Sequence, residues 1–152
     1  MSLMCDTCYR INDKRKYKSW LKCKDKNCSG YMIEVDELFL PSISLLNKKG
    51  YRTAYCCSAH IWENDICDPY ISFDSYIKFP NLPKGFDYDK NIWPDVKWDN
   101  HNEGDKCIRK IIDVTISEED KHEQLLITSL DLLNWVKQLP YIQENNELCK
   151  LP

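Results

Sequence analysis

Residues 5–8 read CDTC and residues 23–28 read CKDKNC, so two closely spaced pairs of cysteines fall within the first 28 positions. Two thiolates on one turn that face two more on a second turn supply the tetrahedral sulfur environment that zinc prefers. The spacing therefore predicts a small zinc ribbon at the N-terminus. The four predicted ligands are Cys5, Cys8, Cys23 and Cys28.

The predicted site has four protein ligands, which leaves the metal no open position for water or substrate. We therefore expect a structural zinc and not a catalytic one. A ribbon of this size has too few apolar residues to fold alone, and zinc binding would supply on the order of ten kcal/mol of its folding free energy. The alternative is four unligated thiols.

The cysteine count supports ligands over disulfides. The chain has 9 cysteines in 152 residues, and an odd number without a secretory leader is typical of a reducing cytosol. No stretch approaches the roughly 18 apolar residues of a spanning helix. These observations predict a cytoplasmic protein with no membrane contact.

Charge is divided unevenly along the chain. Residues 1–30 hold 8 Lys and Arg against 3 Asp and Glu, whereas residues 31–152 hold 13 against 21. Basic residues interleaved with aromatic ones suit phosphate contact and base stacking, although the aromatic residues would equally cover the metal site. The candidate nucleic-acid contacts are Arg10, Lys14, Arg15, Lys16, Lys18 and Trp20.

The middle of the chain predicts a helix followed by strands. Residues 34–49 have an apolar face, Pro41 suits the first helical turn, and Gly50 suits a left-handed C-terminal cap. Residues 51–57 and 70–73 read as strands rich in aromatic residues and cysteine. Residues 76–79 are a possible continuation of the second strand.

The C-terminal part predicts a long loop, a strand and a long helix. The loop covers residues 87–105 and the strand residues 107–114. The helix begins at a capping sequence at Ser117 and ends before Pro140. Its expected core stripe consists of Leu126, Leu130, Leu133 and Val136.

A second group of potential ligands lies between the two middle strands. Cys57, His60 and Cys67 would supply three ligands to a second metal, with Cys56 or a more distant residue such as Cys107 as a fourth. Strand alternation sends Cys56 and Cys57 to opposite faces, so at most one of them faces a common site. The alternative is that these cysteines pack in the core as small apolar residues.

Several runs together resemble a known family. NKKGYRTAYCCSAH at 47–60, YISF at 70–73, LPKGF at 82–86 and WVKQLP at 135–140 resemble small uncharacterised zinc-ribbon proteins of low-GC Gram-positive bacteria and their phages. The resemblance covers most of the chain. That family carries no assigned activity, and the resemblance implies an accessory or regulatory protein of phage or prophage origin.

More remotely, CCSAH at residues 56–60 is similar to the Ser-Cys-Ser-Gly-Arg motif of wybutosine-synthesising tRNA methyltransferases. Cys57 and Ser58 match the motif, whereas Ala59 and His60 replace its Gly and Arg. This similarity implies, as an alternative, an RNA-modifying enzyme that acts around Cys57, Ser58 and His60 with S-adenosylmethionine.

The combined prediction is an α+β protein: an N-terminal zinc ribbon at residues 1–30 attached to a small, mainly antiparallel sheet packed by two helices at residues 31–152, in one compact unit. With 4 glycines the chain has neither a dinucleotide fingerprint nor a P-loop. That favours a recognition, regulatory or inhibitory module over an enzyme. The expected partner is nucleic acid or a host protein.

Overall fold

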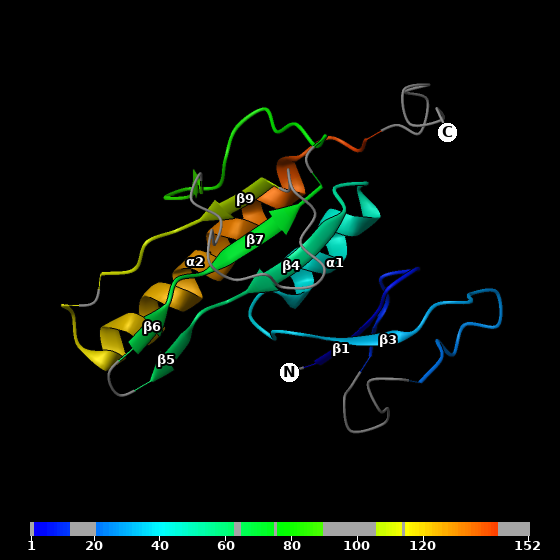
Figure 1. Cartoon of the computed structure of the whole chain (residues 1–152), viewed down its shortest axis with the longest axis horizontal. Helices are drawn as coiled ribbons and strands as arrows, with labels where there is room; N and C mark the ends of the chain where they lie inside the picture. The colour runs from blue at the N-terminus through cyan, green and yellow to red at the C-terminus, as the bar shows by residue number, and fades with distance from the viewer. Residues whose placement is uncertain are drawn as a thin grey trace, which may run out of the picture.

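The computed structural model describes residues 2–12, 21–62, 65–74, 76–89, 106–113 and 115–142, and for residues 55, 60–62 and 65–67 it describes the backbone alone. Within these residues the chain forms two helices and three antiparallel sheets, which confirms the α+β class (Figure 1).

The N-terminal sheet has three strands in the order β2-β1-β3. They are β1 (Ser2–Cys5), β2 (Ile11–Asn12) and β3 (Met32–Val35). Cys5 lies opposite Met32 and Met4 lies opposite Ile33. Because β3 pairs with β1, the sheet of the ribbon continues to Val35, beyond the boundary at residue 30 that the cysteine spacing suggested.

The same pairing explains why the first helix is shorter than expected. The sequence predicted a helix over 34–49, whereas α1 spans Leu40–Lys48, with Pro41 in its first turn as expected. The preceding residues are taken by β3 and by turns that end at Phe39. Gly50 has φ +93°, and its N–H donates to the Asn47 carbonyl, which confirms the left-handed cap.

The central sheet has four antiparallel strands in the order β4-β7-β9-β8. They are β4 (Thr53–Cys57), β7 (Tyr70–Phe73), β9 (Lys106–Arg109) and β8 (Asp87–Tyr88). The strand at 70–73 is confirmed at both ends, whereas the one at 51–57 begins at Thr53. A hairpin of β5 (His60–Trp62) and β6 (Asp65–Cys67), which the sequence did not predict, joins β4 to β7.

Two expected strands are shorter or absent where the backbone turns instead. β9 ends at Arg109, where its pairing with β7 ends at Tyr70, rather than at residue 114. Beyond it, the N–H of Ile112 donates to the Asp68 carboxylate. Residues 76–79 form no strand, and the N–H of Ile77 closes a turn on the Asp74 carbonyl. Of the long loop predicted at 87–105, residues 87–88 belong to β8 and residues 90–105 lie outside the described part of the chain.

Both helices cover the same face of the central sheet, and α1 lies between β4 and the ribbon (Figure 1). The main core between these layers includes Ile43 and Leu46 of α1, Ile71 of β7 and Leu132 of the second helix. Met4 and Val35 of the N-terminal sheet belong to the same core. The ribbon is therefore packed on the body through apolar side chains.

The second helix, α2, spans Glu118–Gln138 and begins as predicted, with the hydroxyl of Ser117 accepting from the N–H of Asp120 at 3.2 Å. The expected core stripe is wrong in part, because Leu126 and Leu130 are exposed. The buried positions are Leu125, Thr128, Ser129, Leu132, Trp135 and Val136. Two of these are hydroxyl residues, which is why counting aliphatic side chains selected the neighbouring face.

The C-terminal end of α2 is fastened to the end of α1 by a lysine. The ammonium of Lys49 donates to the carbonyls of Val136, Lys137 and Leu139 at 2.9, 2.9 and 2.7 Å. The last carbonyls of a helix have no partner within the helix, and a cation there also interacts favourably with the negative end of the helix dipole. The buried side chain of Lys49, directly after α1, thus caps the end of the other helix.

Candidate metal centre

The four predicted thiols converge on one point. The four cysteine Sγ atoms all lie within 4.8 Å of one another. The Sγ atoms of Cys5 and Cys28 are 3.7 Å apart, as are those of Cys8 and Cys23. The structure thus brings together residues that are up to 23 positions apart in the sequence.

These distances fit a tetrahedral metal. With Zn–S bonds of about 2.3 Å, a tetrahedron places its sulfur atoms roughly 3.8 Å apart. Both short sulfur pairs match that edge, and the donors are all thiols, which zinc accepts in structural sites. The arrangement supplies a full set of four ligands, so its chemistry is that of a closed site.

Backbone N–H groups prepare the first turn for a charged sulfur. The N–H groups of Thr7 and Cys8 donate to Cys5 Sγ at 3.4 and 3.5 Å. Burial raises the pKa of the Cys5 thiol, but the N–H groups of Cys8 and Thr7, with the thiols of Cys8 and Cys28, outweigh burial and leave that pKa below its ordinary value. These contacts favour the thiolate of Cys5, which is the form that binds metal. On the same turn, burial, with the thiols of Cys5 and Cys23, raises the pKa of Cys8.

The second turn repeats this contact and depends on a glycine. The N–H of Gly30 donates to Cys28 Sγ at 3.4 Å. A Cβ at this position would lie 2.6 Å from Cys5 Sγ and from the side-chain oxygens of Asp6 and Thr7, closer than real contacts allow. Only a residue without a side chain fits here.

Asp6 joins the two turns. Its carboxylate accepts the backbone N–H of Tyr31 at 2.9 Å and the Thr7 hydroxyl at 2.9 Å. The cysteine spacing gave no hint of this role. The signal that was available is the short polar residue directly after the first cysteine, a residue type that often bonds to nearby backbone.

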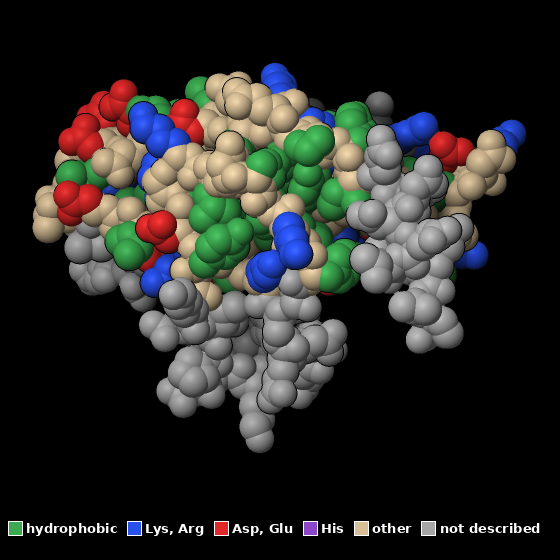
Figure 2. Space-filling model, turned by 90° about the horizontal axis from the view of Figure 1, so that it is seen from above, with side chains coloured by type: hydrophobic (Ala, Val, Ile, Leu, Met, Phe, Trp, Pro, Cys, Tyr) green, Lys and Arg blue, Asp and Glu red, His purple; other side chains and the backbone are tan. Residues whose placement is uncertain are grey.

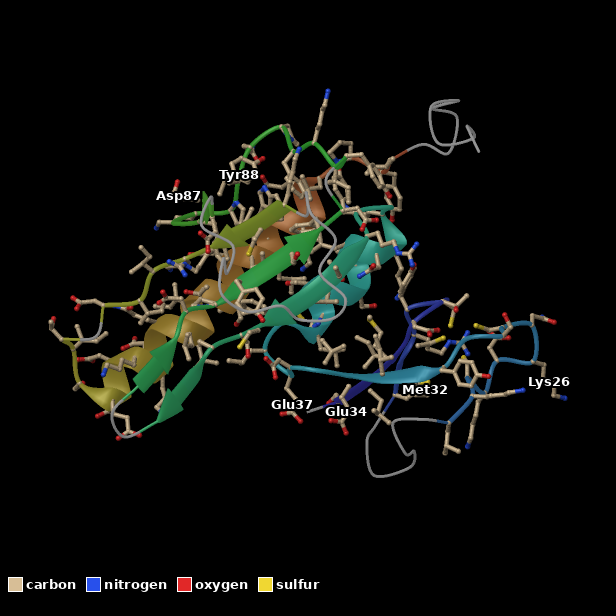
Figure 3. The ribbon with its side chains drawn as sticks, viewed as in Figure 1. Lys26, Met32, Glu34, Glu37, Asp87 and Tyr88 are labelled. Atoms are coloured by element: carbon tan, nitrogen blue, oxygen red, sulfur yellow. The ribbon has the colours of Figure 1, made fainter. Side chains whose placement is uncertain are left out.

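A small apolar layer backs the sulfur atoms. Leu3, Cys5 and Met32 are buried together, and the other three cysteines pack against them. Figure 3 shows Met32 on β3, with Lys26 at the outer tip of the ribbon, away from the body. Along β1, Leu3 and Cys5 thus face the metal site while Met4, between them, enters the main core.

The second predicted metal site is only partly described. β5 and β6 place His60 directly opposite Cys67, but the side chains of both lie outside the described part of the structure. Cys57 is buried and lies opposite Tyr70, whereas Cys56 lies opposite Ile71 and packs against the main core. The two adjacent cysteines therefore face opposite sides of the sheet, as expected.

Two thiols of the central sheet, those of Cys56 and Cys107, are held neutral. Burial, then the Asp36 carboxylate and Cys57, raises the pKa of Cys56 to about 12. Burial and Asp89 likewise raise the pKa of Cys107 to about 12, with Arg109 acting in the opposite direction. Such thiols are poor nucleophiles at neutral pH.

Of the six candidate nucleic-acid contacts, the structure describes Arg10 alone. Its guanidinium is exposed and lies 3.1 Å from the Asp25 carboxylate. Lys14, Arg15, Lys16, Lys18 and Trp20 lie outside the described residues.

The fold and the site define an α+β protein with a four-cysteine centre of the kind that binds a structural metal. No family model, curated protein or solved structure matches the chain. In the part of the chain that the structure describes, no helix has the length and apolar character needed to cross a membrane. Inferences about function therefore rest on the site and its surroundings.

Proposed function

We propose that this chain is a zinc protein of the cytosol whose metal is structural and whose ribbon recognises nucleic acid. The observation that carries the metal part is the convergence of four thiols within 4.8 Å. Four protein ligands complete the coordination of zinc, so the metal stabilises a surface and does not act on a substrate.

The surface of the ribbon supports nucleic acid as the ligand. Lys22, Lys24 and Lys26 are exposed around the second cysteine turn, and Lys26 lies at its outer tip (Figure 3). Tyr31 is 48% exposed, and its backbone pairs with that of Lys22. An accessible ring beside cations is what stacking on a base together with phosphate contact requires.

Cations outnumber carboxylates around the metal turns, where Arg10, Lys22, Lys24 and Lys26 lie with Asp6 and Asp25. Glu34 and Glu37 are exposed at the end of β3 nearer the body, whereas the lysines surround the metal turn (Figure 3). Arg10 pairs with Asp25 at 3.1 Å, and Lys22, Lys24 and Lys26 are the other three cations among the described residues of the ribbon. A polyanion would therefore approach the tip.

Metal content is the first test. Elemental analysis of protein purified without added metal should give one zinc per chain. A value near two would support a second site at Cys57, His60 and Cys67, and a value near zero would contradict the structural role.

Nucleic-acid binding is tested by fluorescence anisotropy with labelled single-stranded RNA, single-stranded DNA and duplexes. Affinity should fall steeply as salt rises, with a slope of about −0.7 per neutralised phosphate on single strands. Replacing Lys22, Lys24 and Lys26 by Ala should flatten that slope, and Tyr31→Ala should weaken binding about tenfold while the zinc content stays unchanged. Tyr76→Ala is the matched control, since Tyr76 is exposed on the body. The proposal fails if no nucleic acid binds at low salt.

A protein partner is the second candidate. Carboxylates gather at the end of the molecule where α2 begins (Figure 2), and they include the exposed residues Glu118, Glu119 and Asp120. An inhibitor or regulator would use such an acidic surface to bind a basic protein.

The enzyme alternative, with a site around Cys57, Ser58 and His60, is supported by the sequence similarity to tRNA methyltransferases. Titration calorimetry with S-adenosylmethionine tests it directly.

A further inference from the structure

The outward face of α2 carries an apolar stripe. Leu126, Ile127 and Leu130 are 54%, 48% and 61% exposed, while the opposite face of the helix is buried in the core. Leu130 lies three residues after Ile127 and four after Leu126, so it neighbours both on the helix surface. A helix that covers a sheet normally presents polar residues to water, and a cluster of large aliphatic side chains there marks a contact surface.

Charged residues stand at both ends of this stripe, with opposite signs. Glu119 and Glu123 are exposed toward the N-terminal end, and Lys137 is exposed toward the C-terminal end. At 3.6 residues per turn, Glu119, Glu123, Leu130 and Lys137 fall within about 40° of one another around the helix. The apolar stripe and both charged ends therefore lie on one line along α2.

The spacing of charged and apolar residues along this line is the same when the helix is read in the opposite direction. Seven positions separate Glu119 from Leu126, and seven separate Leu130 from Lys137. Two copies of α2 placed antiparallel about a two-fold axis near Thr128 would set Leu126 against Leu130 and Glu119 against Lys137, each twice. A parallel arrangement would instead set carboxylate against carboxylate.

We infer that α2 is the contact between two copies of this chain, paired antiparallel about a two-fold axis. An interface of this kind uses the same patch on both copies, which explains why its charges complement themselves. Both ends of the helix are held in place, by the Ser117 cap at its start and by Lys49 at its end. A rigid surface loses little conformational entropy on association.

The dimer is expected to be reversible. A single helix from each copy buries less than the roughly 1,600 Å² of a standard stable interface, so dissociation in the micromolar range is expected. Sedimentation velocity on the zinc-loaded protein, across about 1 to 500 μM, should show the mass rise from 18.1 kDa to twice that value.

Substitutions on the stripe test the contact. Leu130→Glu places a charge opposite Leu126 and should keep the protein monomeric over the same range, with an unchanged circular dichroism spectrum because the position is exposed. Ile33→Glu is the control, since Ile33 is an exposed aliphatic residue on the ribbon. It should dimerise like the unmodified chain.

Charge reversal tests the antiparallel register. Lys137→Glu should weaken the dimer about tenfold, because it replaces two ion pairs by two repulsive pairs. Adding Glu119→Lys to the same chain recreates both pairs and should restore the original affinity. A chain that stays monomeric at the highest concentration would overturn the inference, and so would a double variant that dimerises no better than Lys137→Glu alone.

Discussion

The ribbon and the body of this protein are stabilised by different means. In the ribbon, only two apolar side chains, Leu3 and Met32, are buried beside the four thiols. In the body, two helices and a sheet enclose a continuous core that includes the stacked rings of Tyr51 and Phe79, with centroids 5.6 Å apart. Burial of apolar surface can hold the body together, whereas a ribbon with so small an apolar layer would depend on a metal bound by its four thiols. The difference implies that the two regions should respond separately to the same disturbance.

Removing the metal should produce the largest effect. Chelation should abolish the folding of the ribbon, because the metal supplies on the order of ten kcal/mol there. The helices should stay folded, since α1 and α2 pack on each other and share the main core of the body. Hydrogen exchange with mass spectrometry should show lost protection in residues 2–12 and 21–35 and retained protection in α1 and α2. Cys8→Ser should reproduce this pattern without a chelator.

Loss of protection in both regions at once would contradict that separation. Met4 and Val35 extend from the N-terminal sheet into the main core, and they are the residues through which unfolding would spread. Met4→Ala in the metal-loaded protein would then show whether they couple the regions.

The second prediction disturbs the body alone. Lys49→Met removes the ammonium that bonds to three carbonyls at the end of α2 and leaves those carbonyls without it. The free energy of unfolding should fall by about 3 kcal/mol, measured by urea titration with tryptophan fluorescence. Lys48→Met, at the exposed neighbouring position, should change it by less than about 0.5 kcal/mol. Metal content should be the same in both variants.

The third prediction disturbs the ribbon alone. Gly30→Ala would place a Cβ 2.6 Å from Cys5 Sγ, so the second turn must move away from the first. Metal affinity should fall by about 10-fold to 100-fold, as competition with a chromogenic chelator would measure. Ser29→Ala, at the exposed adjacent residue, should have no effect. Equal affinities for the two variants would mean that the turns are not held by this contact.

The sequence correctly predicted that the four thiols converge, because the spacing of cysteine pairs is a local pattern. Two cysteine pairs at fixed spacing identify all four thiols without any knowledge of the fold. Strand pairing is not local, so the sequence could not show that residues 32–35 join β1 and thereby shorten the helix predicted at 34–49. The capping signals at Gly50 and Ser117 were also correct, because a helix cap, like a cysteine pair, depends on a few neighbouring residues.

The sequence pattern did not predict the contacts between distant elements, and the reason is physical. Nothing in the sequence pattern places Lys49 beside a helix end 87 residues away. The buried face of α2 was assigned to the wrong leucines, since Thr128 lies on that face and receives a hydrogen bond from the Lys110 ammonium at 2.8 Å. Polar residues that are satisfied inside the core resemble surface residues in any hydropathy pattern.

The smallest expected effect is on the pH dependence of stability, which should differ between the ribbon and the body. Ligand thiols bind metal in the deprotonated form, so the ribbon should lose stability as the pH falls. Cys107 behaves in the opposite way, because burial raises its pKa from 9.0 to about 12. Below pH 9 its thiol is neutral in both the folded and unfolded chain. Between pH 9 and 12 only the unfolded chain ionises, and stability is lost by up to about 1.4 kcal/mol per pH unit.

Urea titrations at pH 8 and pH 10 would measure this contribution. Unmodified protein should lose about 1 kcal/mol more than Cys107→Ala between the two pH values. Both proteins contain the same tyrosines and lysines, so the other alkaline titrations cancel in the comparison. Equal losses would show that Cys107 ionises in the folded body as readily as in the unfolded chain. Its thiol would then be open to solvent, and the sheet face that carries it would be a surface and not part of the interior.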